Sequence, residues 1–324
     1  MTTLAPPGPA APARRRFRRR RWLAGVALLA VLLVGLYLGP SAYMADTLTR
    51  PHRQPVTTNP RAYGLRVEDV AFPSRVDHLT LRGWLLTLPG APPARDARLI
   101  VVLHGKDGVR DDPSIGLTPL ASALAHAGYE VLLFDLRGHG ESEGDRFSLG
   151  WYERRDLQGA LDWAQARGYA RIGVYGFSMG AATAILTAAE DRRIAAVAED
   201  SGYADLDQIL AAQIPLRSGL PGLYTPGVIL MTRLMYGADA AKIRPDLAMA
   251  ALRDRPVLIL HGAADTYVPA ANAERLWAAR YGPDGDPGRV YLHIFPGAGH
   301  VKSFKTDPDA YLAVVLHFWQ TALP

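Results

Sequence analysis

From Val67 onward, short apolar runs of strand-forming residues alternate with segments of helical periodicity. The expected strands are Val67–Phe72, His78–Leu88, Leu99–His104, Glu130–Asp135, Arg171–Gly176, Ile194–Glu199, Pro256–His261 and Arg289–Ile294. The expected helices are Thr118–Ala127, Trp151–Arg167, Met179–Glu190, Asn272–Tyr281 and Pro308–Thr321, the last with Asp307 as its N-cap. The first two strands form an antiparallel hairpin, and the later runs of Val, Ile and Leu are typical of strands covered on both faces. The pattern predicts an α/β fold with a mostly parallel, eight-stranded sheet flanked by helices.

One segment interrupts this alternation. About 45 residues, Leu206 to Ala250, separate two strands and are apolar, with prolines at intervals. A connection of this length is expected to be a small helical insert. Its residues Leu230, Met231, Leu234, Met235 and Tyr236 have two interpretations: they line a lipophilic pocket, or they form the core of the helices.

The N-terminal part has a different pattern. Trp22–Leu38 is seventeen residues without a charge and is followed by Gly39-Pro40, which predicts a transmembrane anchor over residues 22–40, near the lower limit of length. Residues 1–13 are rich in Ala and Pro and are expected to be disordered, and the prolines of residues 41–66 favour a stiff linker. The globular domain is then expected over residues 67–324, with the insert at about 206–250.

The distribution of charge predicts how this segment is oriented across the membrane. Seven arginines fall in Arg14–Arg21 and no acidic residue precedes Asp46, so the Arg-rich tail (residues 1–21) is expected to stay cytoplasmic and the domain to be extracytoplasmic. A cleaved export signal, including a twin-arginine one, is an alternative that leaves the domain on the same side, although Tyr43 disfavours cleavage after Ala45. A buried core helix is a third interpretation.

Composition narrows the class of protein. The chain has 324 residues, 49% of them apolar, no cysteine and a net charge of +5 that resides in the tail. The absence of cysteine excludes disulfides, thiolate metal sites and cysteine nucleophiles, and the position of the charge argues against a nucleic-acid partner. Neither a phosphate-binding loop, a zinc-protease motif, a dinucleotide fingerprint nor a calcium loop occurs, so we expect no cofactor and no metal.

The clearest chemical signal is Gly176-Phe-Ser178-Met-Gly180, which lies between a predicted strand and a predicted Ala-rich helix. A serine on so sharp a turn presents its hydroxyl at the carboxyl edge of the sheet, and the flanking glycines relieve crowding. The alternative interpretation is a structural Gly-Ser turn.

A serine nucleophile needs a base and a group that orients the base. Asp265 follows one later strand, and His300 lies in a Gly-rich loop after the next. The order Ser178, Asp265, His300 predicts a catalytic triad. Asp200, at another strand end, is an alternative acid, and its other interpretation is a cap or turn residue.

Five motifs together carry a resemblance to a known family: His104-Gly105, Phe134-Asp-Leu-Arg-Gly-His-Gly-Glu-Ser142, Gly-Phe-Ser178-Met-Gly, His-Gly-Ala-Ala-Asp265 and Gly-Ala-Gly-His300. From about Val67 to its end the chain resembles the α/β-hydrolase superfamily, in the group of serine esterases and prolyl-oligopeptidase-like or serine-aminopeptidase-like hydrolases. The resemblance implies that the backbone N–H groups of Lys106 and Met179 form the oxyanion hole. It also implies that the insert at about 206–250 is a cap over the active site. The Lys106 side chain either favours anionic substrates or is a solvated loop residue, and the resemblance gives His104 and His261 structural roles.

These observations predict a membrane-anchored serine hydrolase that cleaves carboxylic esters, with a small ester or amide as substrate. A peptidase or an acyltransferase with the same triad is the alternative, and a non-catalytic binding module with this fold is a further one. The Ala, Arg, Gly and Pro content suggests a bacterium of high GC content, and no protein partner is indicated.

Overall fold

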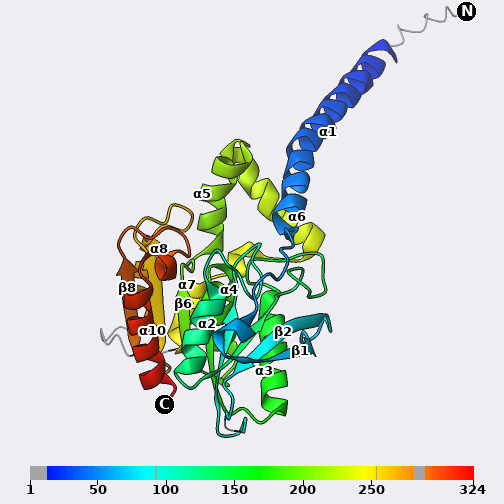
Figure 1. The fold of residues 1–324 in the computed structure, drawn as a ribbon. Coiled ribbons are helices and arrows are strands. Elements are labelled where there is room, and N and C mark those ends of the chain that lie inside the picture. The colour runs from blue at the N-terminus through cyan, green and yellow to red at the C-terminus, as the bar shows by residue number, and fades with distance from the viewer. Residues whose placement is uncertain (1–12, 92, 253, 281–288) are drawn as a thin grey trace, which may run out of the picture.

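The computed structural model describes residues 13–91, 93–252, 254–280 and 289–324 (Figure 1). Most of the N-terminal segment that was expected to be disordered, residues 1–12, lies outside the described residues. Within them, eight strands form one sheet in the order β1-β2-β4-β3-β5-β6-β7-β8. The strands are β1 (Arg66–Pro73), β2 (Thr80–Thr87), β3 (Arg98–Leu103), β4 (Glu130–Phe134), β5 (Arg171–Phe177), β6 (Ile194–Asp200), β7 (Val257–Gly262) and β8 (Val290–Phe295).

Strand direction agrees with the prediction. β2 runs antiparallel to both β1 and β4, and all the other neighbours are parallel. The predicted hairpin is therefore the β1–β2 pair, and each predicted strand is present with ends that differ by one or two residues. The α/β-hydrolase fold expected from the sequence is confirmed.

Helices cover both faces of the sheet. They are α2 (Leu117–His126), α3 (Glu153–Ala166), α4 (Met179–Glu190), α7 (Pro245–Met249), α8 (Ala271–Arg280), α9 (Ser303–Thr306) and α10 (Pro308–Ala322). Alternate residues of β3 point to opposite faces: Val101 packs in one core with α3, α4 and α8, and Ile100 packs in the other with α2 and α10. Burial on both faces explains why the strands are continuous apolar runs.

The start of α10 was predicted from two residues. The side chain of Asp307 accepts a hydrogen bond from the Ala310 N–H at 3.0 Å, and Pro308 occupies the first helical position. The first N–H groups of a helix have no partner within the helix. Asp307 supplies an acceptor for one of them, and Pro308 has no N–H that would need one.

The insert between β6 and β7 is helical, as predicted. Its main elements are α5 (Leu206–Ser218), the short 3-10 helix η2 (Gly222–Tyr224) and α6 (Thr225–Tyr236), which together form a helical hairpin that projects from the body of the molecule toward α1 (Figure 1). Asp205 caps α5 by accepting from the Asp207 N–H at 3.1 Å, and Gly219 ends the helix in the left-handed conformation. The hairpin is called the cap below.

The N-terminal apolar segment is part of a single long helix, α1 (Ala13–Thr49). Its apolar part is exposed, with a mean hydropathy of 2.3 over the most apolar window, which is the length and composition of a helix that can cross a membrane or serve as a signal sequence. Figure 1 shows this helix extending away from the folded body.

The helix is longer than the apolar stretch predicted as the anchor (residues 22–40), because α1 continues through Pro40 to Thr49. A proline inside a helix has no N–H for the carbonyl four residues earlier, here that of Leu36. The Tyr224 hydroxyl of the cap lies 3.4 Å from this carbonyl oxygen and offers it a donor. Contacts with the cap therefore allow the helix to pass a residue that ends most helices.

Residues 41–66, expected to be a stiff linker, are instead held against the rest of the protein. The guanidinium of Arg53 donates to the carbonyl oxygens of Gly140, Ser142 and Gly144 at 2.6–2.8 Å. Further along the segment, the buried carboxylate of Asp111 accepts hydrogen bonds from the backbone N–H groups of Thr57 and Thr58 at 2.7 and 2.6 Å. Polar partners more than fifty residues away fix this segment, and the local sequence gives no sign of them.

Candidate active site

Ser178 lies at the turn between β5 and α4. Its φ of 53° and ψ of −112° place a non-glycine residue in a strained conformation. A Cβ on Gly176 would overlap the carbonyl of Gly180, and one on Gly180 would overlap the carbonyl of Leu103. Glycine is therefore required on both sides of the serine, which is the steric reason for the motif.

The structure brings Ser178, His300 and Asp265 together. His300 Nε2 lies 2.9 Å from Ser178 Oγ, and His300 Nδ1 lies 2.7 Å from Asp265 Oδ2. Asp265 follows β7 and His300 follows β8, so three loops at the carboxyl edge of the parallel strands supply the three side chains. With Nδ1–H donating to the carboxylate, Nε2 is free to accept the serine proton.

Asp265 is held as a carboxylate. Its Oδ1 accepts from the N–H groups of Tyr267 and Val268, each at 2.8 Å. Burial alone raises the pKa of Asp265, but hydrogen bonds from His261 and His300 outweigh this effect and hold the pKa well below its ordinary value. The acid therefore stays ionised across the range in which a histidine titrates.

The alternative acid, Asp200, has other partners. Its carboxylate accepts from the hydroxyl groups of Ser201 and Tyr311, each at 2.8 Å. Ser201 in turn accepts from the N–H of Val301 at 3.0 Å, next to His300. Burial raises the pKa of Asp200. Its geometry is that of a residue that supports the loop carrying His300.

Two buried groups lie close to Asp265: His261, for which the resemblance implied a structural role, and Glu199, for which the sequence indicated none. His261 Nε2 lies 2.7 Å from the Val268 carbonyl oxygen and 3.4 Å from Asp265 Oδ2, so this nitrogen must carry a proton. Glu199 accepts from the Gly202 N–H at 2.8 Å, and its second carboxyl oxygen has no hydrogen-bond partner. Burial raises the pKa of Glu199 to about 8. The contact between His261 and Asp265 could have been suspected from the sequence, because His261 lies near the end of β7 and Asp265 lies in the loop that follows, four residues later.

Lys106 and Met179 border the same cavity as Ser178. A Cβ on Gly105 would lie 3.4 Å from the Ser178 Cβ, so the peptide before Lys106 is close to the serine. Met179 is the first residue of α4, where N–H groups have no partner within the helix. The Lys106 ammonium forms an ion pair with Asp107 at 2.5 Å. It therefore contributes a paired, partly exposed charge rather than a free cation.

Two buried histidines shape the loop that carries Lys106. His104 Nε2 accepts from the Leu136 N–H at 3.0 Å, and His139 Nε2 accepts from the Asp107 N–H at 3.2 Å. Burial lowers the pKa of His104 to about 4 and that of His139 to about 3. Both are neutral at physiological pH and have structural contacts, as expected for His104.

The cavity above Ser178 has a volume of about 270 Å³. Its walls come from α5, from the loop residues Leu149, Tyr203 and Tyr267, and from the last turns of α1 through Met44 and Leu48. The pocket role considered for α6 was wrong. Leu230, Leu234 and Met235 are exposed, Met231 packs against the cluster of Ala45, Ile214 and Val228, and Tyr236 donates to Asp46 at 2.6 Å.

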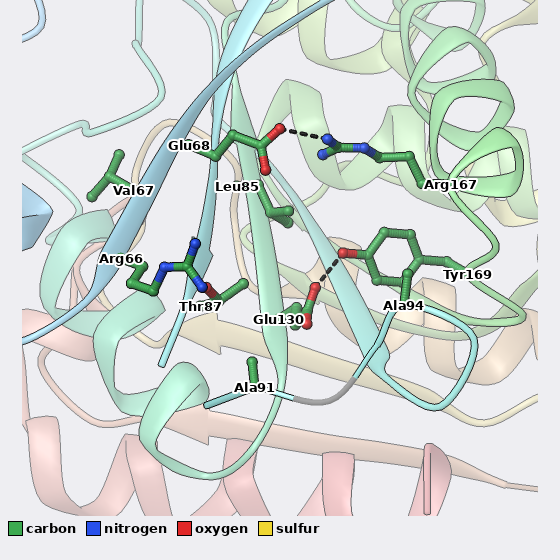
Figure 2. A pocket seen from close by; sticks show the side chains of 10 residues that line it. All are labelled: Arg66, Val67, Glu68, Leu85, Thr87, Ala91, Ala94, Glu130, Arg167 and Tyr169. Carbon is green, nitrogen blue, oxygen red and sulfur yellow. Dashed lines mark hydrogen bonds and ion pairs between the residues drawn. The ribbon is translucent and has the colours of Figure 1, made fainter. Parts of the chain in front are cut away.

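A second hollow, of about 440 Å³, lies at the opposite edge of the sheet. Figure 2 shows two of its contacts, an ion pair between Glu68 and Arg167 and a hydrogen bond from the Tyr169 hydroxyl to Glu130. It holds no nucleophile next to a base, so its greater volume does not make it the better candidate. Within the described residues, no three His, Asp or Glu side chains converge as metal ligands would.

Comparison with known proteins agrees with this architecture. The sequence profile described as "Alpha/beta hydrolase family" matches residues 100–314, more than half of the chain. The chain therefore belongs to the α/β-hydrolase family.

Two bacterial proteins are similar to this chain in sequence, and an archaeal esterase is similar to it in structure. An uncharacterised Bacillus subtilis protein, YqkD, is 31% identical over 196 residues, which are 59% of this chain and 62% of that protein. An uncharacterised Mycobacterium tuberculosis protein is 29% identical over 306 residues, 93% of this chain and 96% of the relative. The structure of a Pyrococcus furiosus esterase covers 85% of this chain and 98% of its own, with 24% identity and a TM-score of 0.69. At that identity the likeness supports the fold alone.

Proposed function

We propose that this protein is a membrane-anchored serine hydrolase that cleaves carboxylic esters through an acyl-enzyme. The observation that carries the proposal is the continuous chain of hydrogen bonds from Ser178 Oγ through His300 to Asp265 at the base of a mostly apolar cavity. An esterase among the structural neighbours is consistent with it. We also propose that, within the α/β-hydrolase family, the protein belongs to the group of serine esterases and prolyl-oligopeptidase-like or serine-aminopeptidase-like hydrolases.

In the first step, Ser178 Oγ attacks the ester carbonyl carbon while His300 Nε2 takes the hydroxyl proton. His300 becomes positively charged, and Asp265 stabilises that charge because it remains a carboxylate. His300 then gives the proton to the departing alcohol oxygen as the carbon–oxygen bond breaks. The acyl group remains on Ser178.

The backbone N–H groups of Lys106 and Met179 are proposed to bind the oxyanion that forms on the carbonyl oxygen. One such donor contributes roughly 3 kcal/mol to the transition state. Support for this assignment comes from the Ser178 hydroxyl, which lies 2.9 Å from His300 Nε2, and from the cavity that Lys106 and Met179 border together with Ser178. A water molecule, activated by His300, then releases the acid and restores the serine.

The same first step serves a peptidase or an acyltransferase. The apolar walls of the cavity favour an acyl chain over a peptide, because polar backbone groups would lose hydrogen bonds to water on entering it. Ester cleavage is therefore the preferred assignment, and the intact triad argues against a binding module.

The proposed location follows from α1. Its exposed apolar stretch acts as a single-pass anchor over residues 22–40, with the Arg-rich tail in the cytoplasm and the hydrolase domain outside. A signal sequence that is removed after export is the alternative for the same helix. The proposed hydrolase domain covers residues 67–324, and residues 41–66 pack on it.

The test is hydrolysis of p-nitrophenyl esters of increasing chain length by the full chain in detergent. Ser178→Ala should lower turnover by about a thousandfold or more, and a fluorophosphonate probe should label the parent protein but not this variant. Ser114→Ala, which removes an exposed serine hydroxyl, should change neither result. A folded parent protein that neither reacts with the probe nor cleaves an ester would overturn the proposal. Labelling of Ser178 without ester turnover would favour a peptidase, tested with peptide p-nitroanilides.

A further inference from the structure

The cavity above Ser178 is elongated along the whole of α5. One face of this helix lines it, at spacings of three and four residues, from Leu206 through Ile209, Leu210, Gln213 and Ile214 to Arg217. Ser218, at the last turn of α5, is also at its edge. These thirteen residues extend about 18 Å at the rise of an α-helix. Ser178 borders the same cavity as Ser218, so the cavity connects the catalytic serine with the last turn of α5, next to the tip of the cap.

The opposite wall belongs to α1. Met44, Thr47 and Leu48, again at helical spacing, border the same cavity. Ala45 is fully buried against Ile214 of α5 and Val228 of α6, so the last turns of α1 are packed into the cap. The cavity is thus a channel between α5 and the helix that carries the apolar anchor segment.

The cap tip lies where the apolar stretch of α1 ends. The rings of Tyr37 and Tyr224 stack with their centroids 5.5 Å apart, and the Tyr37 hydroxyl donates to the Leu223 carbonyl oxygen at 3.1 Å. Tyrosines at such a level are typical of the boundary between hydrocarbon and water. The residues of α1 that precede Tyr37 are the exposed apolar ones.

The tip itself is apolar and exposed. Leu216 and Leu223 expose 77% and 62% of their surface. No charged residue occurs between Arg217 and Arg233, and the guanidinium of the exposed Arg217 stacks on Tyr267, 4.3 Å from the ring centroid. Exposed leucines next to a membrane-spanning helix and without nearby charge are typical of a surface that enters the lipid interface.

We infer that the substrate is a long-chain acyl ester that resides in the lipid bilayer, and that it reaches Ser178 through the channel between α1 and α5, with the Leu216–Tyr224 tip in the membrane interface. This inference rests on the proposed function and specifies its substrate. The reaction is unchanged: the acyl carbon bonds to Ser178 Oγ, the ester bond to the alcohol breaks, and water releases the acid.

The experiment uses the full chain in phosphatidylcholine vesicles and two umbelliferyl esters, the oleate incorporated in the vesicle and the water-soluble butyrate. Leu216→Ser combined with Leu223→Ser should lower oleate hydrolysis by about tenfold, because two leucines no longer enter the interface, and should leave butyrate hydrolysis unchanged. Leu247→Ser is the matched control, because Leu247 is equally exposed, at 65%, but lies on α7. Since α1 keeps every variant on the vesicle, a difference reports on the tip.

A direct measurement of tip insertion is available because the chain has no cysteine. Leu223→Cys and Leu247→Cys each accept one environment-sensitive dye, and a quencher attached to the lipid chains should quench the dye at position 223 and leave that at 247 unaffected. Equal quenching at both positions, or oleate hydrolysis that is unchanged in the double serine variant, overturns the inference. If the parent cleaves butyrate but not oleate, the inference fails and the proposed function stands. If it cleaves neither, the proposed function fails.

Discussion

At the scale of single residues, the turn around Ser178 depends on glycines whose replacement has a predictable cost. A Cβ at position 180 would overlap the carbonyl groups of Leu103 and His104, which belong to the central strand β3 and its following loop. We expect Gly180→Ala to lower the free energy of unfolding by at least about 2 kcal/mol, measured by urea denaturation in detergent. Gly222→Ala is the control, since the nearest atom to its Cβ is 3.6 Å away. Equal stability of the two variants would contradict the close approach.

A second residue-scale prediction concerns Glu199. Its folded pKa of about 8 lies above the ordinary value of 4.5, so between these pH values the folded protein holds a proton that the unfolded chain has lost. The contribution of this group to stability is therefore present below pH 4.5 and is lost as the pH rises toward 8. Glu199→Gln removes that loss, so the variant should gain stability over the parent by roughly 1 kcal/mol per pH unit between pH 5 and 8. A constant difference across this range, measured by urea denaturation, would show that Glu199 is ionised in the folded protein.

The sequence indicated the triad order but not what surrounds it. Ser178, Asp265 and His300 each follow a recognisable strand, and the carboxyl ends of parallel strands meet at one edge. The hydrogen bond between His261 and Asp265 needs a turn that returns the chain onto the strand end, and the Ser201 contact with Val301 joins residues a hundred positions apart. Contacts of this kind depend on tertiary geometry, so neither hydrophobic period nor motif spacing reveals them.

At the scale of elements, the sequence predicted the strands and helices whose hydrophobic residues follow a single clear pattern. Strands covered on both faces read as apolar runs, and helices such as α4 and α10 have both periodicity and clear ends. The sequence pattern did not reveal how far α1 extends past Pro40, where the hydroxyl of Tyr224, far along the chain, offers a partner to the freed carbonyl. The segment after α1 was misread because the carboxylate of Asp111 holds it from a distance.

The attachment of α1 to the body gives a prediction for this element. Asp46 accepts hydrogen bonds from Arg146 at 2.5 Å, Tyr236 at 2.6 Å and Arg50 at 2.8 Å, so one carboxylate joins α1, the body and the cap. Hydrogen bonds from Tyr236 and Arg50 lower the pKa of Asp46 to about 2. Asp46→Asn should increase amide hydrogen exchange in residues 45–49 by about tenfold, measured in detergent by mass spectrometry.

The control for this experiment is Asp254→Asn, because Asp254 pairs with Arg192 at the exposed surface. Exchange in residues 45–49 should be the same in this variant as in the parent. If Asp46→Asn also leaves exchange unchanged, apolar packing of Ala45 is sufficient to hold the end of α1.

At the scale of the whole molecule, the unequal distribution of charge predicts an orientation. The arginines of residues 14–21 precede the apolar stretch, and no acidic residue balances them before Asp46. A C-terminal alkaline phosphatase fusion, active only outside the cytoplasm, should therefore be active in bacterial cells. Replacing the seven arginines with serine should lower that activity several-fold, because the orientation signal is lost. Unchanged activity with the serine tail would assign the orientation to another part of the chain.

The helix proposed as the membrane anchor also supplies one wall of the cavity above Ser178, so proteolysis within this helix would change the shape of the proposed acyl site. A peptidase that cut after Ala45 would detach Met44 from the cavity and make Asp46 the new N-terminus, two residues before Leu48. The released enzyme would keep its triad but would hold acyl chains in an opened site. One gene would then encode two enzymes, an anchored form and a secreted form, that differ in the acyl chains they prefer.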